Sequence, residues 1–291
     1  MTHSGSNVDV LIVGAGISGI GAAYHLQQEC PSKSYVILER RASFGGTWDL
    51  FRYPGIRSDS DMHTFGYAFR PWDKPEVVAS GDAILAYLRD TMDEHGIERA
   101  IRYGQSVVRA SWSSKEARWT VTAADEASGQ TQRYTCKFLY MCAGYYDYEE
   151  GYTPAFEGIE EFEGEVVHPQ KWTEEVDYEG KRIVVIGSGA TAVTLIPELA
   201  KKAEHVTMLQ RSPTYIAAKP NRDAVAALAD TVLPKRWAYF LTRWKNILVS
   251  ILLYWFCQTF PKAAKGSFLK ETRKALGPGF DVEKHFSPRY N

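Results

Sequence analysis

The sequence predicts an α/β protein with two Rossmann-like dinucleotide-binding domains and a helical insertion. Residues 8–38 and 183–209 carry the same order of elements: an apolar strand, a glycine-rich turn, a helix and a second strand. Parallel strands joined by a helix in this way are the repeating unit of dinucleotide-binding folds. Beyond Asp223 the apolar residues change to helical spacing, which indicates the insertion.

The first of these segments opens with Val8–Val13, where only Asp9 is polar, as expected for a parallel strand buried on both faces. A helix is predicted over Ile17–Gln28, which is rich in Ala, Leu and Gln and is followed by the helix breaker Pro31. The apolar run Tyr35–Leu38 supplies the second strand. These features define a complete β-α-β unit.

The second segment repeats the pattern with a strand at Ile183–Ile186, a helix over 190–202 and a strand at His205–Leu209. Pro197 lies inside the helix and should bend it, because proline lacks the backbone donor. Between the two segments, Gln105–Val121 and Gln132–Met141 have strand character around a polar turn near Ser128 and Gly129.

These patterns divide the chain into four parts. We expect a first dinucleotide-binding domain over residues 1–150, incomplete in its last strands, and a linker over 151–180 without clear periodicity. The start of a second dinucleotide-binding domain follows over 181–222. The helical insertion then occupies 223–291.

Composition excludes several classes of protein. With 45% apolar residues and a formal charge of -1, the chain has the make-up of a globular protein and gives no support for nucleic-acid binding. Its four cysteines form no C-x-x-C pair, which argues against a structural zinc or other metal site and against a disulfide scaffold. The polar start, residues 1–7, lacks the pattern of a secretory signal, so a cytoplasmic location is expected.

The first glycine-rich turn, residues 14–19, fits the G-x-G-x-x-G pattern through Gly14, Gly16 and Gly19, with Ser18 between them. Such glycines allow a tight turn, close approach of backbone amides to a pyrophosphate and packing of the helix on the strand. Glu39 lies 25 positions after Gly14 at the end of the next strand, where a carboxylate accepts hydrogen bonds from ribose hydroxyls. A purely structural glycine turn is the alternative.

The second turn has alanine in the third glycine position, which the pattern permits. Its residues are Gly187, Ser188, Gly189, Ala190, Thr191 and Ala192. Arg211 takes the place that Glu39 has in the first segment, 24 positions after Gly187, and Ser212 follows it. A guanidinium can bind a 2'-phosphate that a carboxylate would repel, so this turn favours NADPH over NADH. The alternative is a solvated surface arginine. Two turns of opposite charge suggest two different dinucleotides, a flavin and a nicotinamide.

Two further motifs carry a resemblance to a known family. The series Gly45-Gly46-Thr47-Trp48, Tyr53-Pro54-Gly55 and Asp59 follows the pattern [AG]-G-x-W-x4-[FY]-P-[GM]-x3-D, and Phe162, Gly164, His168 and Trp172 follow F-x-G-x3-H-x3-W. On these residues the chain resembles the class B flavoprotein monooxygenases, whose FAD/NAD(P)-binding fold uses FAD and NADPH. Trp172 is typical of the Baeyer-Villiger branch rather than the N- or S-oxygenating branch, although Thr173 stands where that branch often has Pro or Asp. The stretch 45–61 is similar to actinobacterial ketone and thioamide oxygenases.

The resemblance implies a flavin site that includes Gly46, Thr47, Trp48 and Asp59, and catalytic roles for Asp59 and His168. It also implies insertion of one atom of O2 into a ketone, or oxidation of a sulfide or thioamide, through a flavin C4a-peroxide, with Asp59 holding an arginine above the flavin. Each residue has a simpler alternative. Trp48 and its neighbours could pack beneath a flavin, Asp59 could belong to a surface turn, and His168 could be a core histidine.

In longer relatives of this type the catalytic arginine and the last strands follow the segment that resembles 285–291, so the C-terminal part of the fold is expected to be missing. A truncated, non-catalytic nucleotide-binding remnant is therefore a competing hypothesis. A flavin disulfide reductase shares the plan with two turns, but Thr47 and Trp48 occupy the place where it needs cysteine.

The apolar run Asn246–Cys257 is shorter than the roughly 20 residues of a membrane span. The sequence favours a buried helix here. The wider segment Trp237–Phe260, with cationic residues around it, leaves peripheral membrane contact open.

Overall fold

The computed structural model of the chain describes residues 7–217 and 220–289. Residues 1–6 of the polar start therefore lie outside the described residues. The chain forms two compact units, which we call the first unit (Met1–Arg52 and Gly81–Trp172) and the second unit (Tyr53–Ser80 and Thr173–Asn291). The segment Tyr53–Ser80, expected in the first domain, groups with the second unit.

The first unit contains a six-stranded sheet in the order β3-β2-β1-β6-β5-β4. Its strands are β1 (Asn7–Val13), β2 (Tyr35–Leu38), β3 (Ile101–Arg102), β4 (Gln105–Ser113), β5 (Arg118–Asp125) and β6 (Thr131–Met141). Its helices are α1 (Ile17–Glu29), α2 (Thr47–Leu50) and α4 (Gly81–His95). The predicted β-α-β unit is confirmed, with the second strand at the expected residues.

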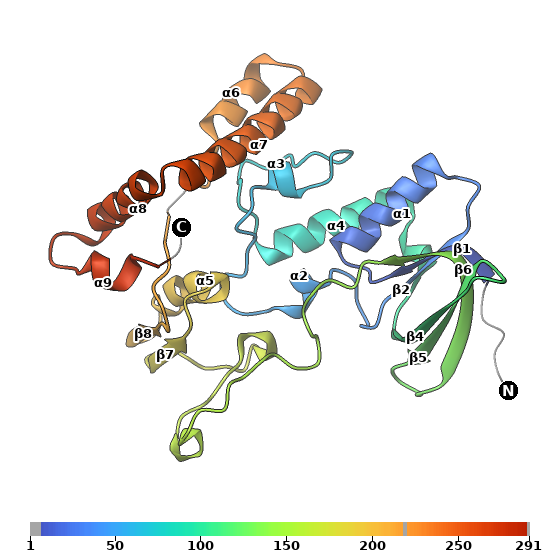
Figure 1. Cartoon of the computed structure of the whole chain (residues 1–291), viewed down its shortest axis with the longest axis horizontal. Coiled ribbons are helices and arrows are strands. Elements are labelled where there is room, and N and C mark those ends of the chain that lie inside the picture. Colours follow the sequence, from blue (N-terminus) through green and yellow to red (C-terminus); the bar gives the residue numbers. More distant parts are fainter. Residues whose placement is uncertain (1–6, 218–219, 290–291) are drawn as a thin grey trace. The chain divides into compact units, whose positions relative to one another are not determined.

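Strand β1 lies between β2 and β6 and is parallel to both. Val13 pairs with Leu38 on one side and with Met141 on the other, so the turn after β1 emerges between two strand ends. Helices α1 and α4 lie on one side of the sheet, and the antiparallel strands β5 and β4 continue the sheet beyond β6 (Figure 1). Buried side chains from β1, β2, β5 and β6 form one core cluster that includes Leu11, Val36 and Val121.

One turn in this sheet was not predicted. The structure divides Gln105–Val121 into β4 and β5, which are antiparallel and joined through residues 114–117. Ala117 adopts φ 49°, a left-handed conformation that a side chain other than glycine seldom takes. The sequence has no glycine, proline or asparagine at this turn, so the usual signal was absent.

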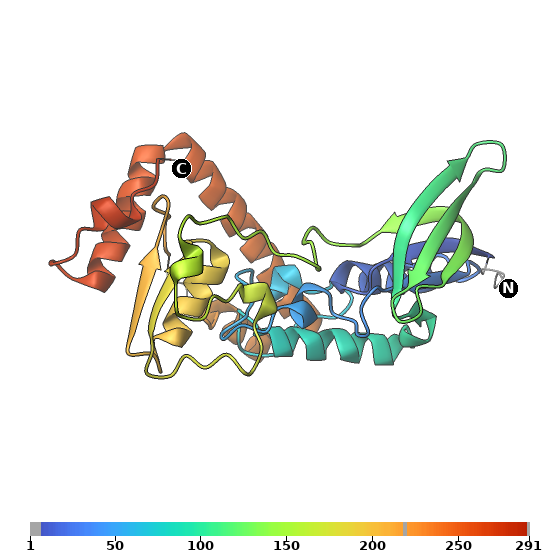
Figure 2. The same cartoon turned by 90° about the horizontal axis from the view of Figure 1, so that it is seen from below.

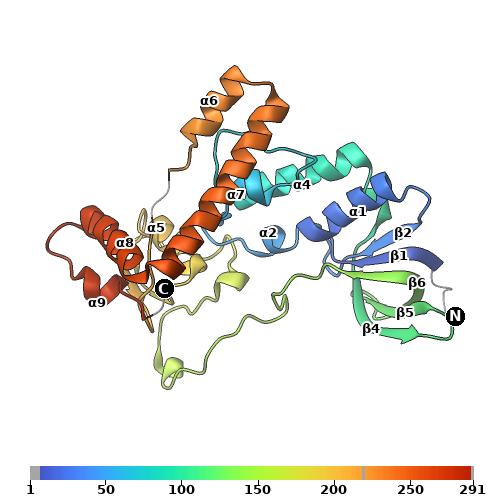
Figure 3. The same cartoon turned by 45° about the horizontal axis from the view of Figure 1, so that its top comes forward.

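The second unit contains a parallel pair, β7 (Arg182–Ile186) and β8 (His205–Leu209), joined through α5 (Ala190–Leu199). Both predicted strands and the helix between them are confirmed, although the helix ends three residues before 202. The remaining helices are α3 (Met62–Phe65), α6 (Ala224–Val232), α7 (Lys235–Thr259), α8 (Pro261–Leu276) and α9 (Val282–Phe286). The expected helical character after Asp223 is thus observed, and Figure 3 shows α6 and α7 as a hairpin.

The expectation of a buried helix at Asn246–Cys257 is wrong. Every residue from 248 to 255 is exposed. The side of α7 that packs against the unit carries Ala238 and Thr242, the two buried residues of this helix, rather than its large apolar side chains. The packed side is thus small and polar, and the periodic apolar pattern faces outward.

Asp9, the one charged residue of β1, joins three parts of the first unit. Its carboxylate accepts hydrogen bonds from the Ser34 amide at 3.1 Å, from the Ser34 hydroxyl at 3.0 Å and from Lys137 Nζ at 3.1 Å. These donors lower the pKa of Asp9 to about 2. The carboxylate therefore ties the start of β1 to the loop before β2 and to β6.

We predict that Asp9→Asn lowers the thermal midpoint of the protein at pH 7 and has little effect at pH 2. The pKa of Asp9 in the folded protein lies below its ordinary value of 3.8. The contribution of the carboxylate to stability is therefore complete above about pH 4 and is lost as the pH falls through about 2. Circular dichroism melts from pH 2 to 7 measure this, with exposed Asp93→Asn as control. A difference in midpoint between Asp9→Asn and wild type that does not shrink with falling pH would contradict it.

Candidate functional site

The first glycine-rich turn has the geometry of a phosphate-binding turn. The Gly14 amide donates a hydrogen bond to the Leu38 carbonyl at 2.8 Å, and Gly14 adopts φ 102°, which favours glycine. Gly16 is the residue before α1, and its extended backbone carries no side-chain cap. The first amides of α1 therefore have no side-chain acceptor and can face an anion. Ser18 lies exposed in the first turn of the helix.

Close packing explains two of the glycines in this turn. A Cβ on Gly19 would lie 1.9 Å from the Gly14 carbonyl oxygen, and a Cβ on Gly14 would lie 2.5 Å from the Cys142 carbonyl oxygen. No real Cβ makes such contacts, so α1 can approach the turn only with glycine at position 19. The backbone of the turn is thereby held against both the helix and the end of β6.

Glu39 closes this turn. Its side chain is buried, with the residue only 5% exposed. Oε2 accepts a hydrogen bond from the Ala15 amide at 2.7 Å, and Oε1 accepts one from the Arg41 amide at 2.9 Å. The carboxylate thus points at the glycine turn, as the spacing of the sequence predicted, and each oxygen keeps a lone pair for a further donor.

The second turn repeats this backbone. The Gly187 amide donates to the Leu209 carbonyl at 2.8 Å, the same distance as in the first turn, and Gly187 adopts φ 133°. Gly189 before α5 has φ -79° and ψ -175°, against φ -80° and ψ -172° at Gly16. Ala190 then begins the helix, again without a side-chain cap. The two turns thus share the hydrogen bond to the neighbouring strand and the conformation of the residue before the helix, and Ala192 is buried at the position of Gly19.

Arg211 and Ser212, the segment predicted to recognise a 2'-phosphate, follow β8 beside the second turn. The Ser188 hydroxyl donates to the Ser212 carbonyl at 3.3 Å, which holds the chain after β8 against the turn. Arg211 is exposed, and within residues 7–217 and 220–289 no hydrogen bond or ion pair occupies its guanidinium. The exposed Arg211 therefore follows β8, whereas the buried Glu39 follows β2.

The Gly45-Gly46-Thr47-Trp48 motif packs against the first turn. The Gly45 amide donates to the Ala15 carbonyl at 3.0 Å, and a Cβ on Gly46 would lie 3.3 Å from Gly16 Cα. Gly46 has φ 56° and precedes α2, which Thr47 and Trp48 begin. Thr47 hydrogen-bonds the Tyr148 hydroxyl, and burial raises the pKa of that tyrosine. The structure thus brings Gly46 and Thr47 to the turn that Glu39 closes.

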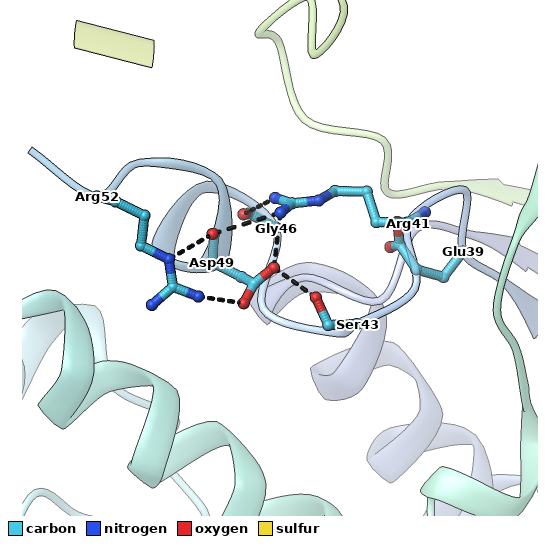
Figure 4. Close-up of polar contacts among 6 residues, drawn as sticks. All are labelled: Glu39, Arg41, Ser43, Gly46, Asp49 and Arg52. Atoms are coloured by element: carbon cyan, nitrogen blue, oxygen red, sulfur yellow. Dashed lines mark hydrogen bonds and ion pairs between the residues drawn. The ribbon is translucent and has the colours of Figure 1, made fainter. Parts of the chain in front are cut away.

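A charged network beside this motif was not foreseen from the sequence. Asp49, in α2, forms an ion pair with Arg41 at 2.7 Å and one with Arg52 at 2.7 Å, and accepts a hydrogen bond from the Ser43 hydroxyl (Figure 4). Arg41 also reaches the Gly46 carbonyl at 3.5 Å. Asp49 and Arg52 occupy unspecified positions of the family pattern, and Arg41 and Ser43 precede it, so no signal marked them. They fix the loop between Glu39 and α2.

The Tyr53-Pro54-Gly55 motif lies in the second unit, on the helix of the second turn. Tyr53 is buried and forms a hydrogen bond with Thr191, and burial is the main cause of the raised pKa of Tyr53. Gly55 has φ 80°, and a Cβ there would lie 2.5 Å from Glu198 Cγ and 3.3 Å from the Thr194 carbonyl oxygen. No sequence pattern predicted that this motif packs against α5.

The two residues predicted to be catalytic have simple local surroundings. Asp59 is exposed and lies 3.7 Å from the guanidinium of Arg57. His168 begins a short 3-10 turn, where its Nδ1 accepts a hydrogen bond from the Gln170 amide at 3.2 Å, and its ring packs on Gly151. Their catalytic roles therefore stay predictions. The second motif shapes the linker locally, since the ring of Phe162 also covers Gly164.

We predict that Gly19→Ala destabilises the first unit by roughly 3 kcal/mol or more, because the new methyl group would collide with the Gly14 carbonyl. Gly189→Ala is the matched control, since a Cβ there meets no described residue within 4 Å. Guanidinium unfolding followed by circular dichroism measures both variants. Equal stability of Gly19→Ala and wild type would mean that the helix does not pack on the turn as described.

We also predict that Tyr53→Phe destabilises the second unit by about 1 kcal/mol, because the substitution removes the hydroxyl that is hydrogen-bonded to Thr191. Tyr152, which is 87% exposed, supplies the control Tyr152→Phe, for which no change is expected. Urea unfolding followed by tryptophan fluorescence measures the difference. If the two variants matched, the hydrogen bond would contribute nothing to the attachment of the motif.

Comparison with known proteins agrees with these motifs. The family described as flavin-binding monooxygenase-like matches residues 7–262. The FAD-containing monooxygenase EthA of Mycobacterium tuberculosis is 54% identical over 286 residues, which cover 98% of this chain and 58% of that protein. The probable FAD-binding monooxygenase AlmA of Acinetobacter baylyi is 48% identical over 286 residues, covering 98% and 57%. The chain thus spans less than two thirds of the length of these relatives.

Solved structures give the same result. An oxidised steroid monooxygenase bound to NADP has a TM-score of 0.66 at 34% identity, covering 77% of this chain and 42% of that one. A complex of OTEMO with FAD and NADP has a TM-score of 0.61 at 30% identity, covering 71% and 40%. The two glycine turns and the two motifs therefore stand in a chain that belongs to the flavin-binding monooxygenase-like family.

Proposed function

We propose that this chain provides the dinucleotide-binding part of an FAD-dependent, NADPH-consuming monooxygenase. The observation that supports this most directly is the pair of turns with the same backbone and opposite charges. A buried carboxylate is hydrogen-bonded to the first turn, and the segment that contains the exposed Arg211 is hydrogen-bonded to the second. The carboxylate suits the ribose hydroxyls of one dinucleotide, and the arginine suits the 2'-phosphate of another.

At the first turn, the amides after Gly16 would bind the pyrophosphate of FAD and Glu39 would bind its ribose hydroxyls. The fit is supported by the free lone pairs of Glu39 and by the absence of a side-chain cap on α1. Gly46 and Thr47 adjoin this turn, so they would border the same cofactor. Arg41 and Asp49 hold that border in place.

At the second turn, the amides at the start of α5 would bind the pyrophosphate of NADPH. Arg211 would bind its 2'-phosphate, because a guanidinium offers paired donors to phosphate oxygens. The Ser188 and Ser212 contact would keep this segment beside the turn. Thr191, fixed by Tyr53, would present its backbone amide in the first turn of α5.

When bound, the flavin would activate O2 and the nicotinamide would supply two electrons. We propose that the substrate is a small ketone, converted with O2, NADPH and a proton into an ester, NADP+ and water. Support comes from Trp172, typical of the Baeyer-Villiger branch, and from the cyclohexanone monooxygenases among the similar structures. Oxidation of a sulfide or thioamide is the second candidate, suggested by the likeness of residues 45–61 to thioamide oxygenases.

We predict that Arg211→Ala weakens binding of NADP+ by about 10- to 100-fold and leaves the weaker binding of NAD+ unchanged, because the charged hydrogen bonds to the 2'-phosphate are worth about 1.5–3 kcal/mol. Isothermal calorimetry on the 291-residue chain measures both affinities. Arg133→Ala removes an exposed cation of the first unit and serves as the control. Equal loss for NADP+ and NAD+ would reject the 2'-phosphate role.

The enzyme itself is tested by purifying the chain and measuring bound flavin and NADPH oxidation. Yellow protein with substrate-dependent oxygen uptake supports the proposal, and Glu39→Gln should then lower flavin content. Colourless protein without NADPH consumption would reject catalysis by this chain. If such protein still bound NADP+ with the predicted dependence on Arg211, the non-catalytic remnant would be the better description.

A further inference from the structure

Helix α7 has the opposite arrangement of polar and apolar side chains from a typical surface helix of a globular protein. Three polar side chains in its middle, Arg243, Lys245 and Asn246, contact the rest of the second unit. Arg243 donates to the carbonyls of His63 at 2.6 Å and Gly66 at 3.2 Å, and Asn246 donates to Asp61 at 2.9 Å. Lys245 forms an ion pair with Asp223. The polar face in the middle of α7, which would usually contact water, therefore makes intramolecular contacts instead.

The opposite face of α7 is apolar and exposed. Positions three and four apart along this face carry Trp237, Phe240, Leu241, Trp244, Leu248, Ile251, Leu252 and Trp255, each more than 45% exposed. The helix has 25 residues and is about 37 Å long. From 248 to 255 the exposure extends around the whole helix, and only Ser250 in that run is polar. An apolar surface of this extent marks a binding face.

Charge identifies the kind of partner. Residues 235–276, which form α7 and α8, contain nine lysines and arginines and a single acidic residue, Glu271, a net charge of +8. Lys245 and Arg273 form ion pairs with Asp223 and Glu283, two acids outside this range, so a net charge of +6 is left to meet a partner. The rest of the chain holds 25 basic and 34 acidic residues, a net charge of -9. The exposed cations Lys235 and Arg236 precede the apolar stripe and Lys262 follows it. The partner should therefore be anionic as well as apolar.

Two such faces from two copies of the chain would bring like charges together, which disfavours a symmetric dimer through α7. A lipid surface with anionic headgroups matches both properties, because acyl chains accept the apolar stripe and headgroups accept lysine and arginine. Tryptophan and tyrosine also prefer the headgroup level of a bilayer, and the stripe contains three tryptophans. No single helix among the described residues meets the criteria for a membrane span. Helices α7 and α8 meet them only as a pair bent by 114° (Figure 2).

We propose that α7 and α8 form a surface that binds the interface of an anionic lipid bilayer, with α7 lying in the plane of the headgroups. The apolar stripe enters the acyl region to a shallow depth. The flanking cations contact lipid phosphates. This surface is independent of the two glycine turns, so its failure would leave the proposed enzymatic function untouched.

Flotation on sucrose gradients with the 291-residue chain tests this surface. Vesicles of phosphatidylcholine and phosphatidylglycerol (70:30) should carry the protein upward, and vesicles of phosphatidylcholine alone should bind it far less. Reversing three cations in Lys235→Glu/Arg236→Glu/Lys262→Glu should weaken binding at least about 100-fold, since each cation near the surface contributes roughly a factor of five. High salt should also weaken binding to the anionic vesicles, because it screens the charges.

The matched control is Lys33→Glu/Lys115→Glu/Arg133→Glu, which changes three exposed cations of the first unit by the same total charge and should bind normally. The uncharged variant Leu241→Gln/Leu248→Gln/Leu252→Gln should lose binding without a change in charge. Circular dichroism verifies that each variant is folded. The proposal is overturned if wild type fails to float with anionic vesicles or if the control weakens equally. It is also overturned if the chain forms oligomers without lipid that the glutamine variant abolishes.

Discussion

The hydrogen bond from the Ala15 amide to the Glu39 carboxylate is the contact on which the candidate site depends. It joins the end of β2 to the turn after β1, and so fixes the spacing between the turn amides and the carboxylate, the groups that we propose bind a pyrophosphate and a ribose. The carboxylate is buried, and a buried carboxylate without donors is costly. The Ala15 and Arg41 amides supply those donors, so fold stability and readiness for a ligand come from the same two bonds.

The second turn shows what changes when only the partner residue changes. Its backbone angles and its hydrogen bond to the neighbouring strand match the first turn closely. In place of a buried acid that satisfies a turn amide, an exposed arginine follows the strand. An arginine has no acceptor for a turn amide, so it cannot replace Glu39 as a structural contact. Its side chain is left available for an anionic ligand, which is the physical reason to assign a phosphate there.

Much of the fold could be predicted from the sequence, because it is encoded locally. The strands Val8–Val13 and His205–Leu209, and the contact of Glu39 with the first turn, followed from apolar runs and counted spacings. The turn at Ala117 had no sequence signal. Contacts across long sequence distances were also hidden: neither the ion pairs of Asp49 nor the contact of Tyr53 with α5 follows from periodicity. Helical spacing identified α7 correctly but did not tell which of its faces packs inward, since its packed face is polar.

The two turns also differ in what surrounds them. A Cβ on Gly14 would collide with the carbonyl of Cys142, because β6 lies directly beside β1, whereas a Cβ on Gly187 meets nothing within 4 Å. The first turn is enclosed by a sheet in which β1 has a neighbour on each side. The second rests on a pair of strands, and Val184 and Ile186 of β7 remain more than half exposed. Among the described residues, glycine at position 14 is therefore required by packing as well as by φ, while glycine at 187 is required by φ alone. Equal sequence motifs thus impose unequal constraints, because a motif fixes the local backbone and the neighbouring strands decide how tightly it is held.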